Sequence, residues 1–242
     1  MTPCWVKRQH LRPARPGHGA RQSAAALVAL GLVLGLLASA NRTSAAPLLR
    51  YALDPDSSQV RIHTGASGLF GFAGHEHDIA PARFTGTAVI DSANVTKVVL
   101  AITVPTDSLR VVSDESPETR AKIERQMREQ VLETQRFPTV VIRGVTFSPA
   151  GDAPGYPGPP LGKDVSGELV IELALHGVTR TIALPIDIQV DRQRLRARGE
   201  FPIRHKDFDM KRVKVAGVVN VADAIMIDFD LRGRCLGPEP AQ

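Results

Sequence analysis

Apolar and polar residues alternate with a period of two along most of this chain, and that alternation limits what it can fold into. In one example, Leu169, Ile171 and Leu173 fall on one face while Glu168 and Glu172 fall on the other. Because successive side chains of a strand point to opposite faces, such segments predict antiparallel sheet with one dry and one wet face. Eight segments alternate in this way or are short and β-branched: 59–64, 83–91, 97–104, 139–147, 165–175, 182–190, 195–203 and 225–231.

One segment departs from the alternation and predicts a helix. Ser116 is a suitable N-cap, and Pro117 fits the first helical position because its missing N–H is not needed there. Apolar residues then recur at Ile123, Met127 and Val131, which gives a narrow apolar stripe on the helix. We expect this helix to cover an edge or an end of the sheet.

The fold class we expect is all-β, an antiparallel eight-stranded barrel with one covering α-helix. A closed barrel removes exposed edges and can enclose one small ligand, although a two-sheet sandwich shows the same alternation. The Pro/Gly-rich stretch 148–164 predicts a long surface loop, since strands of the same kind continue on both sides. Small residues on the presumed inner faces leave either a cavity or room for close packing: Gly86, Ala88, Gly167, Ala197 and Gly199.

The first 46 residues differ from the rest and have the features of a secretion signal. Bases without any acid precede an apolar run from Ala24 to Ala38, and small-residue sites follow it. The run is shorter than the ~20 residues that a helix needs to cross a bilayer, which favours a cleaved signal over a permanent anchor. We expect cleavage after Ala40, a periplasmic or secreted location, a barrel domain at 47–235 and a C-terminal tail at 236–242.

The charge balance argues against a nucleic-acid-binding protein. The chain has 30 Lys and Arg against 25 Asp and Glu, but the first 46 residues hold six of the bases, leaving 24 bases and 25 acids. A nearly neutral domain has no electrostatic footprint for nucleic acid. After the leader, Cys235 is the one cysteine, which we expect just beyond the last strand, so the core rather than a disulfide must hold the domain together.

Five short motifs occur in a fixed order along the chain. They are Tyr51-Ala52-Leu53-Asp54-Pro55-Asp56-Ser57-Ser58-Gln59-Val60, Arg83-Phe84-Thr85-Gly86, Arg136-Phe137-Pro138-Thr139, Leu175-His176-Gly177-Val178-Thr179-Arg180, and Phe201-Pro202-Ile203 followed by Asp207-Phe208. In these motifs the chain, from about Tyr51 to Leu231, resembles the YceI-like family, although Asp209 stands where the family has a glycine. The resemblance implies a lipocalin-like barrel that binds a long isoprenoid or similar amphiphilic lipid without catalysis.

A barrel of this kind would hold the lipid tail against its apolar inner face. Each CH₂ group removed from water contributes ~0.8 kcal/mol, so no elaborate polar site is required. The basic residues Lys206, Lys211 and Arg212 could hold a phosphate or diphosphate headgroup at the barrel mouth, although the acids Asp207 and Asp209 among them also fit a solvated loop of mixed charge. The candidate tail contacts are Ile62, Phe84, Ile102, Ile171, Leu173, Leu184, Phe201, Phe208 and Phe229.

An alternative hypothesis is a metal-binding protein or metal-dependent enzyme. His75 and His77 lie two apart, so on an extended backbone both would point the same way. With a third ligand from Asp78, His63 or His205, they could bind Zn²⁺ or another transition metal. Zinc sites use three or four protein ligands, and the sequence suggests two, so local hydrogen bonds are the simpler interpretation.

The remaining residues and motifs give little indication of a catalytic function. We expect His176 to make a turn or strand-end hydrogen bond rather than to act in catalysis. The chain has no phosphate-cradling glycine-rich loop and no Gly-x-Ser-x-Gly nucleophile motif, so we predict no cofactor and no catalytic residues. A third hypothesis is an interaction module that uses the Pro/Gly-rich loop or the helix as its contact surface.

Overall fold

The computed structural model describes residues 46–66, 77–151, 158–212, 214–215, 218–219 and 221–240. Its strands are β1 (Leu48–Leu53), β2 (Gln59–Ala66), β3 (His77–Pro81), β4 (Thr85–Asp91), β5 (Asn94–Pro105), β6 (Leu109–Val111), β7 (Thr139–Pro149), β8 (Asp164–Leu175), β9 (Val178–Val190), β10 (Arg194–Arg204), β11 (Lys214–Val215), β12 (Val218–Val219) and β13 (Val221–Pro238). Helix α2 (Pro117–Gln126) continues into the π-helical turn η3 (Met127–Val131), and the short 3-10 turns are η2 (Thr106–Ser108) and η4 (His205–Phe208).

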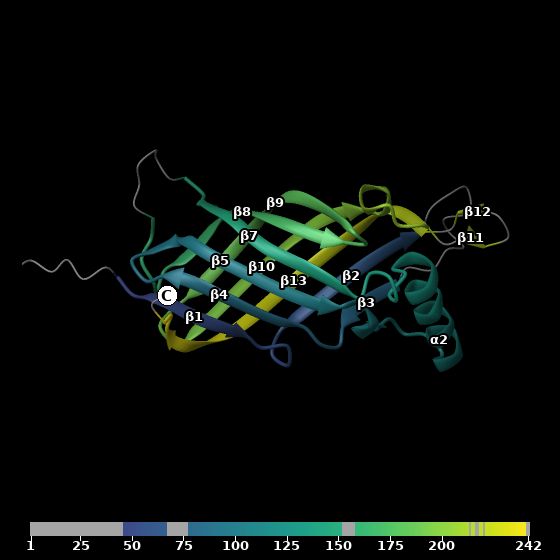
Figure 1. Ribbon diagram of the computed structural model, residues 1–242, viewed down its shortest axis with the longest axis horizontal. Helices are drawn as coiled ribbons and strands as arrows, with labels where there is room; N and C mark the ends of the chain where they lie inside the picture. The colour runs from purple at the N-terminus through teal and green to yellow at the C-terminus, as the bar shows by residue number, and fades with distance from the viewer. Residues whose placement is uncertain are drawn as a thin grey trace, which may run out of the picture. The chain divides into compact units, whose positions relative to one another are not determined.

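Eight antiparallel strands close into a barrel (Figure 1). They follow the order β1-β4-β5-β7-β8-β9-β10-β13, and the ring closes because β13 also pairs with β1. The expectation of an all-β, lipocalin-like barrel with a covering helix is therefore confirmed, and the sandwich alternative is wrong. No helix within the described residues is long and apolar enough to span a membrane.

The remaining strands of the large sheet continue three of the barrel strands. β2 pairs with β13 beyond the point where β1 leaves it, β3 pairs with β2, and β6 pairs with β3. The pairs β1/β2, β3/β4 and β5/β6 thus behave as three long strands, each interrupted once. β13, the longest strand, spans both halves and pairs with β10 along most of its length.

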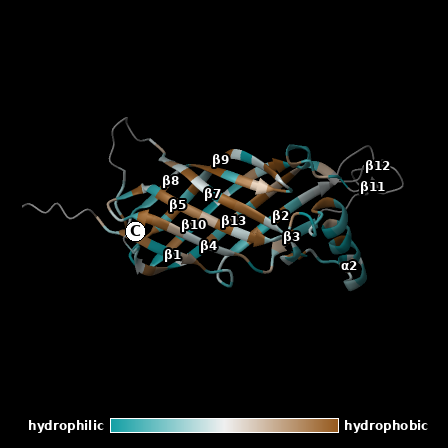
Figure 2. Ribbon diagram, viewed as in Figure 1, coloured by the Kyte–Doolittle hydropathy of each residue, from teal (hydrophilic) through white to brown (hydrophobic). Residues whose placement is uncertain are grey.

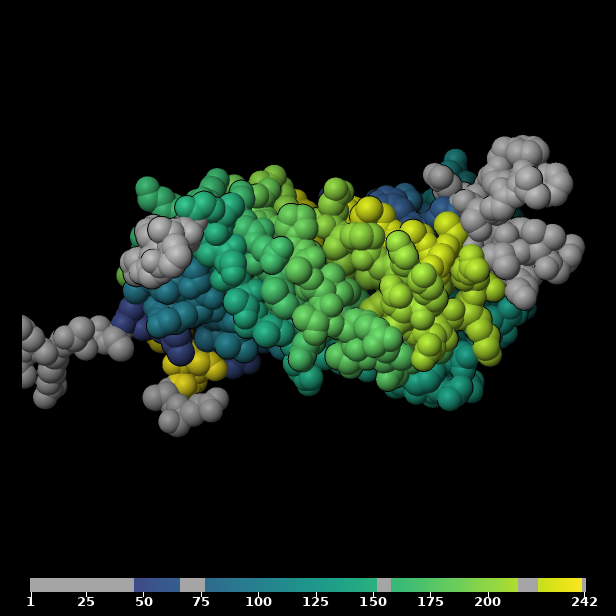
Figure 3. Space-filling model, turned by 90° about the horizontal axis from the view of Figure 1, so that it is seen from above, coloured from purple at the N-terminus to yellow at the C-terminus, as the bar shows by residue number. Residues whose placement is uncertain are grey.

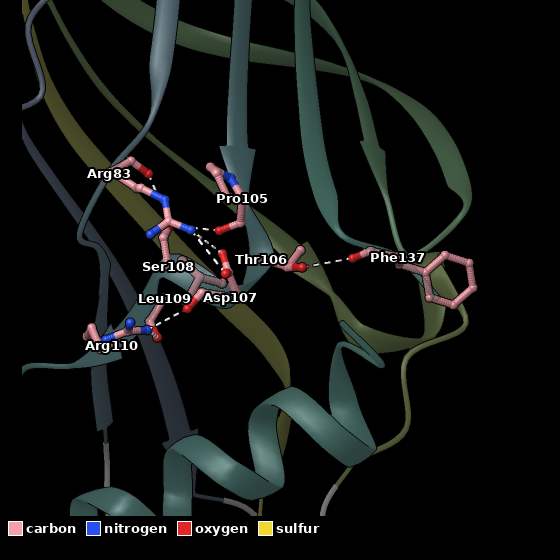
Figure 4. A network of polar contacts seen from close by, with 8 residues as sticks. All are labelled: Arg83, Pro105, Thr106, Asp107, Ser108, Leu109, Arg110 and Phe137. Atoms are coloured by element: carbon pink, nitrogen blue, oxygen red, sulfur yellow. Dashed lines mark hydrogen bonds and ion pairs between the residues drawn. The ribbon is translucent and has the colours of Figure 1, made fainter. Parts of the chain in front are cut away.

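The interruption between β5 and β6 is a tightly bonded corner (Figure 4). Ser108 is fully buried, and its hydroxyl lies 2.7 Å from the carbonyl oxygen of Pro105 and 3.0 Å from that of Arg83. The hydroxyl of Thr106, which is 1% exposed, donates to the carbonyl oxygen of Phe137 at 2.8 Å. Because buried polar groups need partners, these bonds fix the end of β5 against the segments that lead into β4 and β7.

Helix α2 lies at the end of the barrel near β3 (Figure 1), where it contacts β6. The predicted cap is confirmed: Pro117 begins the helix, and the Ser116 hydroxyl accepts a hydrogen bond from the Thr119 N–H at 3.2 Å. The Glu124 carboxylate accepts from the Val111 N–H at 3.1 Å, which ties the helix to β6. The prediction that the helix covers an end of the sheet is confirmed.

At the seam of the barrel, β1 was not predicted from the sequence, and β13 was predicted too short, as 225–231. β1 buries Leu49, Tyr51 and Leu53, but apolar residues on its outer face hide the alternation. β13 runs to Pro238, so Cys235 lies inside the last strand opposite Tyr51 rather than beyond it. The inward positions near the C-terminal end of β13 hold small residues. The prediction from sequence relied on large apolar side chains, so it ended this strand too early. The segment expected as a tail from position 236 begins inside this strand.

The barrel interior is apolar, and at the end opposite α2 a buried tyrosine bonds to the residue that follows β9. Hydropathy alternates along the strands of the barrel (Figure 2), and in Figure 3 the outer atoms of β8 to β10 form a continuous surface. Tyr51 is fully buried, and its hydroxyl donates to the carbonyl oxygen of Asp191 at 2.6 Å. Burial raises the pKa of Tyr51 to about 12, so this hydroxyl stays protonated and the bond persists.

Most of the small inward residues serve close packing rather than a cavity. A Cβ added at Gly167 would lie 2.3 Å from the carbonyl oxygen of Ser148, and one at Gly199 would lie 2.5 Å from that of Pro185. At Gly86 the nearest atom, Cδ1 of Leu53, would be 2.6 Å away. Ala88 is part of the core, and of the five small residues considered, Ala197 is the one that lines a cavity.

Candidate functional site

The barrel encloses a cavity of about 740 Å³, which lies within the usual size range of ligand pockets. Its lining is dominated by Leu, Ile, Val and Phe side chains from β2, β5, β7, β8, β9, β10 and β13. This follows from the alternation in the sequence, because every second residue of each strand points inward. Both Leu195 and His205, at the two ends of β10, line it. Ten residues at ~3.3 Å each make the lined strand ~33 Å long, so the cavity suits a long, narrow ligand.

The structure places eight of the nine predicted tail contacts on the cavity wall. These eight are Ile62, Phe84, Ile102, Ile171, Leu173, Leu184, Phe201 and Phe229. Phe208 is the exception: it is 1% exposed and belongs to the core, but it does not line the cavity. The turn η4 follows β10 at this point, so the side chain of Phe208 no longer follows the strand alternation. Contact between any of these residues and a lipid stays a prediction.

Helix α2 contributes a part of the wall that the sequence analysis did not assign to the site. Ile123, Met127 and Val131, the predicted apolar stripe, line the cavity together with Leu132. The stripe itself was the available signal, because a helix that covers a barrel end must turn its apolar face to the interior. The polar lining residues are Thr64, His77, Thr119, Lys122, Gln126 and His205.

Two histidines lie at this polar part of the lining. The side chain of His205 is buried, and its Nδ1 lies 3.1 Å from the carbonyl oxygen of Asp223. Burial lowers the pKa of His205, so its imidazole is neutral at neutral pH. Nδ1 of His77 lies 3.2 Å from Oε1 of Glu115, which precedes α2, so this contact links β3 to the start of the helix.

The predicted headgroup residues lie outside the cavity. Lys211 Nζ is 3.5 Å from Oε1 of Glu133, and Lys206 Nζ is 4.0 Å from Oδ2 of Asp223. Their side chains are 77% and 62% exposed, and Arg212 is exposed as well. None of the three lines the cavity, so the geometry favours the alternative interpretation, a solvated loop of mixed charge.

Among the described residues, no third ligand completes the metal site that the sequence suggested. His75 lies outside them. His77 lines the cavity, but Asp78, its neighbour in β3, points to the opposite face, where its carboxylate lies 2.7 Å from Nδ1 of His63. Over the described ranges, no group of three or more His, Cys, Asp or Glu side chains is arranged to hold a metal ion.

His63 instead bridges two carboxylates on the outer wall. It lies on β2 between Asp78 of β3 and Asp228 of β13, and its Nε2 is 2.5 Å from Oδ2 of Asp228. Hydrogen bonds to Asp78 and then to Asp228 raise the pKa of His63. When protonated, the ring therefore links three neighbouring strands.

This bridge predicts a pH-dependent contribution to stability. Because the pKa of His63 is higher in the folded chain, the stabilisation is complete below the unfolded value of about 6.5 and is lost as the pH rises through the folded value. The side chain is 46% exposed, so the effect stays below about 1 kcal/mol. Urea unfolding of the protein and of His63→Gln should show a larger difference at about pH 5.5 than at about pH 9. An equal difference at both pH values would contradict the bridge.

Comparison with known proteins identifies the fold and the family. The family model of the YceI-like domain matches residues 51–232. The chain belongs to the YceI-like family. Two solved structures share the barrel: that of BcnA from Burkholderia cenocepacia, with 15% identity over 74% of this chain and 98% of that one and a TM-score of 0.56, and that of a polyisoprenoid-binding domain from Saccharophagus degradans, with 16% identity over 78% and 98% and a TM-score of 0.54. A search of curated proteins gives no match.

The structure explains two of the YceI-like motifs. The hairpin between β8 and β9 turns at His176 and Gly177, with φ of 53° and 79°, as a two-residue turn with both central residues left-handed requires. His176 is buried and its Nδ1 lies 3.0 Å from the carbonyl oxygen of Phe208, so its predicted structural hydrogen bond is confirmed. Asp209, which replaces the glycine of the family motif, has φ of 53°, a conformation that Asp tolerates better than most residues.

Proposed function

We propose that this chain is a binding or carrier protein for a long-chain amphiphilic lipid, such as an isoprenoid, and that it performs no catalysis. The observation that carries the proposal is the predominantly aliphatic cavity that extends along β10 from Leu195 to His205, which directly follows the strand. Membership of the YceI-like family supports it, as does the similarity of the barrel to a domain described as polyisoprenoid-binding.

The energetics of such a cavity favour a long apolar tail. Ten methylene groups moved from water into the barrel contribute ~8 kcal/mol, and each further group adds ~0.8 kcal/mol. Part of this gain is offset by the lost freedom of the bound molecule. Affinity should therefore increase with chain length until the tail fills the cavity, which separates a lipid carrier from a site for a compact ligand.

We also propose that the protein works in the periplasm or outside the cell. The support is the leader sequence, with its bases, its short apolar run and the small residues before Asn41. A lipid that has to cross an aqueous compartment requires a soluble carrier that hides its tail from water. An exported barrel with an apolar interior would meet that requirement.

Native mass spectrometry of the protein recovered from the periplasmic fraction of its own cells tests these proposals together. We expect an added mass that disappears on denaturation and reappears as a lipid in the organic extract, and a mature chain that begins at Asn41. Repeated recovery of empty protein that takes up neither isoprenoid lipids nor fatty acids would overturn lipid binding. A full-length chain that stays in the cytoplasm would overturn export.

A further inference from the structure

The two ends of the cavity differ in polarity. Thr64, His77 and His205 lie at one level of the barrel, because Thr64 pairs with His77 across β2 and β3 and with Ile225 of β13, next to the end of β10. Helix α2 covers the same end and adds Thr119, Lys122 and Gln126. The six polar residues among the described lining of the cavity therefore gather at the α2 end.

At the opposite end, the described lining residues offer a headgroup no polar side chain to bond. The lining residues there include Leu53, Leu195 and Ile186, which are buried and aliphatic. A polar group placed among them would lose its bonds to water without replacement, at a cost of a few kcal/mol. An amphiphile in this cavity therefore has one favourable orientation, with its tail at the Leu195 end and its headgroup beneath α2.

The charge of a headgroup at the α2 end would depend on Lys122, which lies on the cavity wall. Other cations near this end of the barrel have carboxylate partners: Arg128 lies 2.5 Å from Glu124, and Lys211 lies 3.5 Å from Glu133. Lys122, by contrast, forms no ion pair with a described residue, and among the described residues it is the one Lys or Arg on the cavity wall. Its long side chain can keep its ammonium group at the rim while its methylene groups contact the apolar lining.

We infer that the α2 end of the cavity is a headgroup site for an anionic lipid, with Lys122 as the cation and Gln126 and Thr119 as neutral donors. The inference rests on the proposed lipid-binding function and adds the charge and the direction of the ligand. Carboxylate and phosphate headgroups share the required chemistry, since both accept charge-assisted hydrogen bonds from an ammonium group. The site differs from the exposed cluster around Lys206 and Arg212, which does not line the cavity.

A pair of ligands that differ in charge tests the headgroup. Palmitate and hexadecanol have tails of matched length, so the ratio of their dissociation constants isolates the carboxylate. We expect the protein to bind palmitate about fivefold more tightly, and Lys122→Gln to remove that preference while leaving hexadecanol unchanged. Arg125→Gln is the matched control, because Arg125 is exposed on the same helix and does not line the cavity. Repeating the measurement with hexadecyl phosphate distinguishes a phosphate from a carboxylate preference, and a preference for either anion that depends on Lys122 supports the site.

The possible outcomes separate this inference from the proposed function. Binding of neither ligand would overturn both. Equal affinity for the alcohol and both anions, or equal effects of Lys122→Gln and Arg125→Gln, would overturn the headgroup site and leave lipid binding intact. A fatty acid with a photoreactive diazirine at the end of its tail provides a second readout: it should label the strands near Leu195, and labelling of α2 instead would overturn the orientation.

Discussion

Replacing Ala197 with Trp is expected to lower the affinity for long-chain lipids by about 100-fold or more. Ala197 lies on β10 and lines the cavity between its two ends, so a large side chain there would occupy the path of the tail. Displacing four methylene groups from the barrel removes ~3 kcal/mol of binding free energy, and 1.4 kcal/mol corresponds to tenfold in affinity. Titration with a fluorescent fatty acid measures the loss.

The matched control for this substitution is Ala183→Trp. Ala183 is an alanine on β9 whose side chain is exposed, so the same change adds a large side chain on the outside of the barrel. We expect this variant to bind lipid like the unaltered protein. If Ala197→Trp retains full affinity while it folds normally, the tail does not pass this point, and the cavity is not the lipid site.

Replacing Gly199 with Ala is expected to destabilise the barrel by about 2–3 kcal/mol. The added methyl group would lie 2.5 Å from the carbonyl oxygen of Pro185 on the neighbouring strand and 2.9 Å from the ring of Phe229. The backbone cannot yield as a flexible side chain can, so β9 and β10 would have to separate locally. For a domain of this size, the melting temperature should fall by about 5–10 °C, which differential scanning calorimetry would record.

Gly65→Ala is the control for this effect. Gly65 also lies in a strand, but a Cβ there would meet Ala222 at 3.6 Å, an ordinary van der Waals contact. Its melting temperature should change by less than about 2 °C, since the substitution causes no close contact. Similar losses at both positions would mean that the close approach at Gly199 is not what makes a glycine necessary there.

The strand alternation made most of the fold predictable. Segments such as 165–175 and 195–203 have large apolar residues on one face, and the structure turns that face to the cavity. The helix was predictable for the same reason, because its cap and its stripe are local features of the sequence. Eight of the nine proposed tail contacts line the cavity because strand periodicity determines which side chains point inward.

What could not be predicted depends on contacts between distant segments. Nothing local distinguishes Lys122, which lines the cavity, from Lys211, which pairs with Glu133 outside it. Lys122 lines the cavity because α2 lies across the end of the barrel. Phe208 was misplaced because the turn η4 ends the alternation at His205. The glycines were ambiguous as well, since whether a missing side chain leaves space or admits a neighbour depends on the strand beside it.

The barrel can close only after β13 has been synthesised, because β13 pairs with β1 along the seam. The seam joins Tyr51 to Cys235, so the first and the last strands of the barrel must meet across more than 180 positions of chain. Such a closure is entropically costly and slow compared with the hairpin between β8 and β9. A chain still under synthesis, or one cut short before β13, has an open sheet whose aliphatic face is exposed to water. The period before the final strand arrives is therefore when this protein is most vulnerable to aggregation and proteolysis.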